Sequence, residues 1–160
     1  SEMKINIDDN IILFFGLIRK YKGLDTLLRA VNQHFKTNSN SKLIIAGEAY
    51  EDKRKYLKII DELKIQNKII WFDEFIPNKK IEKLMILSDL LVLPYRSASQ
   101  SGVLSQAWQY EIPSISTNVG GLSEYIDEGK SGYVIKNNDS NSLAQKITYF
   151  FESADSLKMK

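Results

Sequence analysis

The sequence predicts a single Rossmann-like α/β domain, in which helices flank a parallel sheet. Three observations carry this prediction: short apolar runs alternate with helical patterns, the runs are almost free of polar residues, and polar or glycine-containing loops separate them. Strands and helices that alternate in this way form right-handed βαβ units. We therefore expect a parallel sheet covered on both faces.

The expected strands are short and begin soon after the polar opening residues. The first ends at Gly16, and an aromatic pair closes the third. Five apolar runs span residues 11–15, 43–47, 69–72, 90–93 and 132–135, and residues 113–116, which include two serines, are expected to form a further strand.

The clearest helical pattern follows the first strand. Its apolar residues recur at i, i+3, i+4, i+7 and i+11, and they are Leu24, Leu27, Leu28, Val31 and Phe35. Further helical patterns cover about residues 51–64, 81–85, 103–108 and 143–151, with a short turn near residues 122–126. Asp139 or Ser140 is expected to cap the last helix.

Composition and charge exclude several classes of protein. With 160 residues, 43% hydrophobic and 26% charged, the chain is typical of a folded domain. A net charge of +2 argues against nucleic-acid binding by bulk charge. Without cysteine and with one histidine, His34, no thiolate metal site and little histidine chemistry are expected. No apolar run reaches the roughly 18 residues of a membrane span, so a cytoplasmic location is expected.

The domain organisation follows from the same pattern. Residues 1–10 are polar and are expected to form a linker or starting segment, residues 11–153 the nucleotide-binding domain, and residues 154–160 a polar tail. In a parallel sheet the loops after the strands share one edge, and ligands bind there near the point where strand order reverses. The chemistry of the chain should therefore lie in these loops.

The first such loop carries two cations. Arg19 and Lys22 stand between Gly16 and Gly23. An arginine fork and a lysine point charge beside small residues suit a diphosphate. A solvated basic turn is the alternative interpretation.

The loop after the fourth strand resembles an anion site. Small residues from Ser99 to Gly102 open a helix whose free N–H groups lie at the positive end of its dipole. The residues predicted to bind a phosphate there are Ser101, Gly102, Val103 and Leu104. An ordinary N-cap made by Ser99 or Ser101 is the alternative.

The remaining loops offer groups for a nucleoside. Glu48 follows the second strand, and Phe75 and Ile76 follow the third, although Phe75 fits the hydrophobic core equally well. The loop after the fifth strand carries residues 118–121 and Glu124. Cationic, amide-rich and glycine-rich loops on one edge together favour a nucleotide diphosphate.

Five segments give the chain a resemblance to a known family. They are FFGLIRKYKGLDTLLRA, LIIAGE, SDLLVLPY, SQSGVLSQAWQYEIPSIST and NVGGLSEYIDEGKSGYVI. Together they resemble the C-terminal, donor-binding domain of GT-B retaining glycosyltransferases of family 4, the "glycosyl transferases group 1" domain. The resemblance covers about residues 11–151.

The resemblance implies a role for each matching residue. Arg19 and Lys22 would bind the diphosphate of the donor and stabilise its leaving charge, and the amides of residues 102–104 would hold its distal phosphate. Glu48 and the backbone of Phe75 and Ile76 would lie near the nucleoside. The donor would be a UDP-sugar or GDP-sugar, with no metal and no further cofactor, and the transferred group a hexose.

The chain departs from the family at two positions. A pair of glutamates separated by seven residues, common in the family, would fall at Ala98 and Gln106. Gln106 is still able to hydrogen-bond a ribose, whereas Ala98 cannot replace a carboxylate that binds the sugar. The resemblance also implies an N-terminal acceptor domain, so the chain alone is expected to bind nucleotide weakly and to transfer nothing. Synthesis of a surface polysaccharide is the process that the family suggests.

Several residues receive structural interpretations. His34 is expected on the helix surface, and Trp71 and Trp108 in packing. The basic runs at residues 53–55 and 79–80 are expected to be solvated helix faces, with peripheral membrane contact as the alternative.

Other protein classes were weighed against the glycosyltransferase. A nicotinamide-binding domain needs G-x-G-x-x-G after the first strand, which FFGLIRKYKG does not supply. A receiver domain needs an acidic cluster where Gly16 and basic residues stand. A non-enzymatic α/β nucleotide-binding or interaction module stays open, because the two glutamates are missing.

Overall fold

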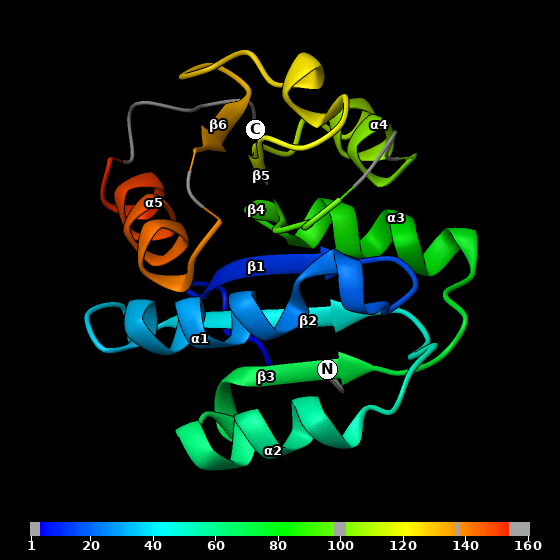
Figure 1. The fold of residues 1–160 in the computed structure, drawn as a ribbon, viewed down its shortest axis with the longest axis vertical. Helices are drawn as coiled ribbons and strands as arrows, with labels where there is room; N and C mark the ends of the chain where they lie inside the picture. Colours follow the sequence, from blue (N-terminus) through cyan, green and yellow to red (C-terminus); the bar gives the residue numbers. More distant parts are fainter. Residues whose placement is uncertain (1–3, 98–101, 137, 154–160) are drawn as a thin grey trace.

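The chain forms a six-stranded parallel sheet with helices on both faces (Figure 1), as the computed structural model shows for residues 4–97, 102–136 and 138–153. The strand order is β3-β2-β1-β4-β5-β6, and every pairing is parallel. The order therefore reverses between β1 and β4. The predicted Rossmann-like fold is confirmed.

The described elements alternate as the sequence pattern predicted. The strands are β1 (Asn10–Phe15), β2 (Ser41–Ala46), β3 (Ile69–Phe72), β4 (Leu90–Leu93), β5 (Ser114–Thr117) and β6 (Gly132–Ile135). The α-helices are α1 (Leu24–Phe35), α2 (Arg54–Leu63), α3 (Asn78–Leu87), α4 (Gly102–Gln109) and α5 (Ser140–Glu152). Short 3₁₀ turns are η1 (Lys20–Lys22), η2 (Gln66–Lys68) and η3 (Leu122–Tyr125).

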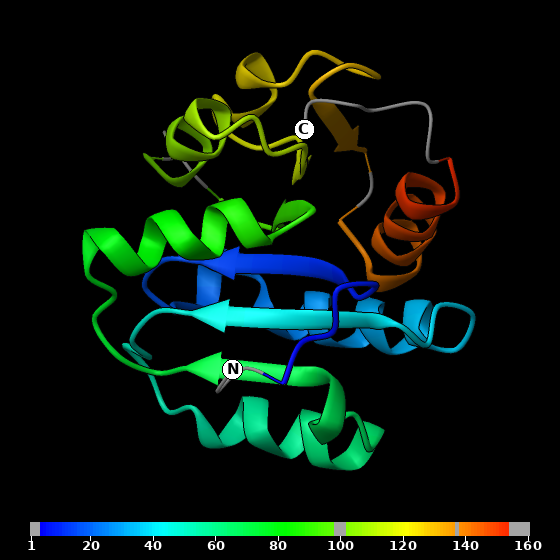
Figure 2. The same ribbon diagram turned by 180° about the vertical axis from the view of Figure 1, so that it is seen from behind.

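Two hydrophobic layers enclose the sheet. Helices α1, α2 and α5 pack on one face, and α3, α4 and η3 pack on the other (Figures 1 and 2). Alternate side chains of β1 enter each layer, since Ile12 and Phe14 belong to the first and Ile11 and Leu13 to the second. Strand β1 is therefore central and buried on both faces, which explains its unbroken apolar sequence.

The five residues of the first helical pattern are all buried in α1, as predicted. At the other end of the chain, Asp139 caps α5 by accepting a hydrogen bond from the Ser142 amide at 2.7 Å. Helix α2 begins three residues later than the pattern suggested, at Arg54. Such differences at helix ends are ordinary because the first turn has no internal partners.

The expectation that His34 lies on the surface is wrong. Its side chain is fully buried, and its ring nitrogens share hydrogen bonds of 2.8 Å with Thr148 of α5 and Ser41 of β2. Burial lowers its pKa to about 4. The reason is that α5 packs against α1, so that α1 is buried over a wider face than its aliphatic residues alone would indicate.

Trp108 was expected in packing, which is also wrong. Leu104 and Ala107 of helix α4 pack into the core. Trp108 is the residue after Ala107 and lies outside the buried face of the helix, where 64% of it is exposed. Trp71 is half-buried and packs against the core from β3, as expected.

Candidate functional site

The carboxyl ends of β1 and β4 form the switch point of the sheet, where strand order reverses. The β1 loop (Gly16–Gly23) leads to α1, and the segment after β4 leads to α4. Open α/β sheets bind ligands at such an edge. The structure thus brings the two loops that carry the predicted phosphate contacts to the same place.

Lys22 and the first turn of α4 both lie against Gly16. A Cβ atom added at Gly16 would lie 2.7 Å from Lys22 Nζ and 3.5 Å from Val103 Cγ2. The Lys22 ammonium group and the Val103 side chain of α4 therefore both lie close to the end of β1. A bound anion at this place would meet a lysine charge and the N-terminal amides of a helix together.

The Lys22 side chain is mostly buried, with 8% of the residue exposed. Its Nζ lies 5.6 Å from the ring centroid of Tyr95. It has no ion pair with any residue that the structure describes. Burial, and then the charge of Arg19, lower the pKa of Lys22. A buried cation without a counter-ion gains from binding an anion.

Arg19 is exposed and reaches the same region from the start of η1. Its guanidinium carbon lies 4.9 Å from the ring centroid of Tyr50. The β1 loop and the loop after β2 are joined beneath it, since the Ile18 amide donates to Glu48 O at 2.8 Å and the Tyr50 amide donates to Ile18 O at 2.9 Å. Tyr50, which the sequence did not single out, therefore helps to hold Arg19 in place.

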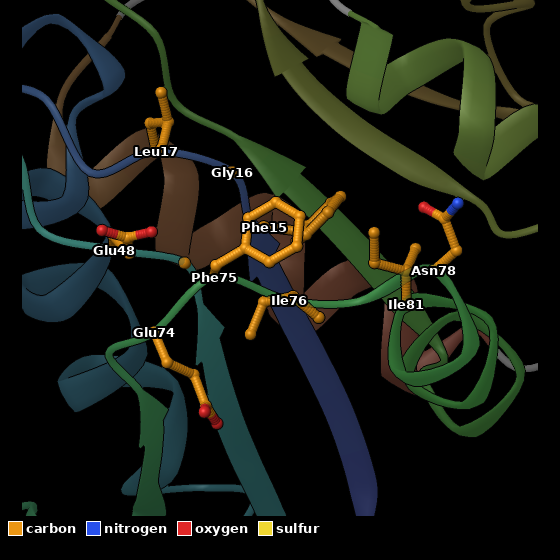
Figure 3. Close-up of a pocket in the computed structure, with 10 residues that line it drawn as sticks. Phe15, Gly16, Leu17, Glu48, Glu74, Phe75, Ile76, Asn78 and Ile81 are labelled. Carbon is orange, nitrogen blue, oxygen red and sulfur yellow. The ribbon is translucent and has the colours of Figure 1, made fainter.

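A pocket of about 210 Å³ opens beside this site (Figure 3). Figure 3 shows Phe75 across its mouth, with Leu17 and Glu48 on one side and Asn78 and Ile81 on the other. Phe75 is 75% exposed, so it is a wall of the pocket rather than part of the core. Gly16, Glu48, Phe75 and Ile76, all predicted as site residues, are brought together here.

Two close contacts between backbone segments hold these loops together. A Cβ atom at Gly47 would lie 1.9 Å from Gly16 O, and one at Gly23 would lie 2.0 Å from Pro94 O. Both glycines have positive φ, at 149° and 74°. Only glycine allows the loops after β1, β2 and β4 to touch in this way.

The predicted anion site at α4 is described in part. Gly102 begins the helix, and a Cβ atom there would meet nothing within 4 Å among the described residues, so a side chain at this position would be exposed. Val103 and Gln106 are half-buried, and Leu104 is in the core. Ala98 and Ser101 lie outside the described residues. The described part of the predicted anion site is therefore the first turn of α4, whose Val103 side chain lies near Gly16.

Residues outside the prediction also contribute to the pocket. Leu17 extends from the end of β1, whereas Asn78 and Ile81 come from the first turn of α3. Asn78 and Ile81 do not follow a strand directly, and α3 lies near this edge of the sheet only because of how it packs. A pattern of loop residues could not have found them.

Within residues 4–97, 102–136 and 138–153, no group of three acidic, histidine or cysteine side chains is placed to hold a metal ion. Among the same residues, no helix is long and apolar enough to cross a bilayer.

Comparison with known proteins agrees with this fold. N-acetyl-alpha-D-glucosaminyl L-malate synthase of Bacillus anthracis is 26% identical over 91% of this chain and 37% of its own length. The crystal structure of the C-terminal domain of a glycosyl transferase group 1 family protein, LpcC of Francisella tularensis, superposes with a TM-score of 0.80 at 20% identity, over 91% of this chain and 76% of that one.

A third similar protein carries a nucleotide sugar. Anabaena Alr3699/HepE in complex with UDP-glucose gives a TM-score of 0.82 at 21% identity, over 93% of this chain and 41% of that one. The chain thus spans about 37–41% of the full-length relatives that it matches. Their shared fold is that of the C-terminal domain of GT-B glycosyltransferases.

The family model for "Glycosyl transferases group 1" matches residues 2–159, nearly the whole chain. With the parallel sheet, the basic β1 loop and the pocket beside it, this match shows that the chain belongs to the glycosyl transferases group 1 family.

Proposed function

We propose that the chain is the donor-binding domain of a retaining glycosyltransferase, and that a nucleoside diphosphate sugar binds between the β1 loop and α4. The observation that carries this proposal is the position of Lys22, whose buried ammonium lies beside Gly16, close to which the Val103 side chain of α4 also lies, and has no ion pair in the described part of the chain. The family match supports the class of ligand.

The two cations and the helix amides would act on the diphosphate. Lys22 would contact it from below, and Arg19, held by Tyr50, from the solvent side. The amides of residues 102–104 would hold the distal phosphate. When the bond from sugar to phosphate breaks, negative charge grows on this diphosphate, and preorganised donors lower the free energy of that state.

The pocket beside Gly16 would take the nucleoside. Gly16 lines this pocket and also lies beside Lys22, so a nucleoside attached to a diphosphate at Gly16 would enter the pocket. Glu48 would accept hydrogen bonds from ribose hydroxyls, and Phe75 and the Ile76 backbone would frame the base. Gln106 on α4 would hydrogen-bond the ribose. UDP is the first candidate because the similar Anabaena structures hold UDP or UDP-glucose, and GDP is the second.

The remaining parts of the reaction lie outside this chain. A retaining transfer of a hexose by same-face attack needs an acceptor hydroxyl, which we assign to an N-terminal domain of a longer protein. The chain alone would then bind donor weakly and transfer nothing. We expect no metal or further cofactor, a cytoplasmic location, and a role in polysaccharide synthesis; peripheral membrane association of the parent enzyme stays open.

Chemical-shift mapping by NMR tests this proposal and detects even weak binding. UDP, GDP and NADH are titrated separately into ¹⁵N-labelled chain. UDP or GDP should shift the amides of Gly16, Lys22 and Gly102, and NADH should not. Shifts confined to other surfaces, or none with either diphosphate, would refute the proposal and leave the non-enzymatic module as the better interpretation.

A further inference from the structure

The β1 loop that carries Arg19 and Lys22 is held mainly at its two ends. Its 3₁₀ turn η1 has no side chain that caps it. Its start is joined to the loop after β2, and its end touches Pro94 through Gly23. The residues between, Lys20 and Tyr21, are exposed. The Tyr21 ring contacts Tyr95 edge-on, at a centroid distance of 6.0 Å. The backbone of η1 needs further partners if the two cations are to keep their positions.

Arg96, two residues after Pro94, makes that connection. Its backbone amide donates to Tyr21 O at 2.6 Å, and its Nη1 donates to Lys20 O at 2.7 Å. Its Nη2 donates to both carboxylate oxygens of Asp25 at 2.7 Å. One residue after β4 thus holds η1 and the first turn of α1 at the same time.

These contacts give little stability by themselves. The Arg96 and Asp25 side chains are 38% and 36% exposed, and ion pairs at this exposure contribute little to folding. Their geometry is nevertheless specific, because both carbonyl contacts lie within η1, between Arg19 and Lys22. Contacts that fix the position of η1 but add little to the stability of the fold indicate a role in the site.

We infer that Arg96, together with Asp25, is a positioning residue that holds the β1 loop so that Arg19 and Lys22 face the donor diphosphate; this inference rests on the proposed function. Arg96 does not bind the ligand in this account, since its guanidinium is already engaged by Lys20 O and Asp25. It acts by preventing the loop from moving away. A displacement of about 1 Å at such a site weakens function strongly.

The direction in which one substitution changes the affinity for UDP distinguishes a positioning role from direct binding. Asp25→Asn removes a negative charge from the first turn of α1 and leaves Arg96 one acceptor oxygen in place of two. If Arg96 bound the diphosphate, or if only charge mattered, UDP would bind Asp25→Asn as tightly as the unchanged chain or more tightly. If Asp25 and Arg96 position the loop, UDP binds more weakly, against the direction of the charge change.

The experiment measures the Kd of UDP and the Tm for the unchanged chain and three variants. Asp25→Asn and Arg96→Lys should each raise the Kd about tenfold, because neither keeps the two-armed clamp. Their Tm should stay within about 4 °C. Glu62→Gln is the matched control, since it makes the same charge change in an exposed ion pair with Lys58 on α2 and should leave Kd unchanged.

The two levels of failure are distinct. If UDP binds the unchanged chain and Asp25→Asn binds it equally or better, the inference is overturned and the proposed function stands. If Tm falls in step with affinity, Arg96 is merely structural and the inference is also overturned. If the unchanged chain binds neither UDP nor GDP, the proposed function fails, and the inference fails with it.

Discussion

The buried His34 predicts how the stability of the protein changes with pH. Its neutral ring links α1, β2 and α5 through Ser41 and Thr148, at 2.8 Å on each side. One ring nitrogen donates and the other accepts, so the neutral form satisfies both hydroxyl groups. Protonation would place a charge inside the first hydrophobic layer, which is why burial lowers the pKa to about 4 from 6.5.

The sign and magnitude follow from linkage. Because the pKa is lower in the folded chain than in the unfolded one, the unfolded state binds the proton first as pH falls. Stability is therefore complete above pH 6.5 and is lost as pH falls toward 4. Between about pH 7.5 and about pH 5.5 the free energy of unfolding should drop by about 1.4 kcal/mol, and by about 3 kcal/mol once the ring is fully protonated.

Urea unfolding at the two pH values measures this loss, and His34→Gln is the control. Glutamine keeps a donor and an acceptor at the same place but does not titrate. The chain has one histidine, so the difference in pH slope between the two proteins isolates His34. If the unchanged chain loses no more stability than His34→Gln over this range, the argument from burial is refuted.

Two further predictions concern the loops of the site. Gly47→Ala should destabilise the fold by about 3 kcal/mol or more, because its Cβ would lie 1.9 Å from Gly16 O at a φ of 149°. Gly102→Ala, with nothing within 4 Å, should be neutral or slightly stabilising in the same urea assay, and equal losses would contradict the packing argument. Tyr50→Ala should weaken UDP binding about threefold through the lost cation–π support of Arg19, without a large change in Tm. An unchanged Kd would show that Arg19 needs no such support.

The sequence was sufficient for the fold and for the edge where the site lies. The apolar run before Gly16 and the stripe from Leu24 to Phe35 alternate in a way that only a covered parallel sheet satisfies. Parallel strands then bring their following loops to one edge, which is why the sequence alone places the loops of Gly16, Lys22 and Val103 together. The periodicity of apolar residues can be read from short segments, and the parallel topology follows from the order in which those segments alternate.

The errors came from contacts between distant segments. His34 stands seven residues after Leu27 and is on the buried side of α1, but its hydroxyl partner on α5 is 114 residues away. Arg96 and Asp25 are 71 residues apart, and no local pattern joins them. A basic residue just after β4, matching Arg19 just after β1, was the available signal for Arg96. Trp108 was misplaced because helix α4 buries a narrow arc that its eight residues do not reveal.

The most direct test of the donor site is calorimetric titration of UDP, GDP and the matching diphosphate sugars into three forms of the chain. The forms are the unchanged chain, the double variant Arg19→Ala/Lys22→Ala, and a control, Lys58→Ala/Lys83→Ala, that removes two charges from exposed helix positions. We predict that one diphosphate binds the unchanged chain and the control alike. The double variant should lose at least about 100-fold in affinity, because each charge-assisted contact contributes about 1.5–3 kcal/mol. Equal affinity in the double variant would contradict the account, since the diphosphate would then bind without the two cations on which the proposed site depends.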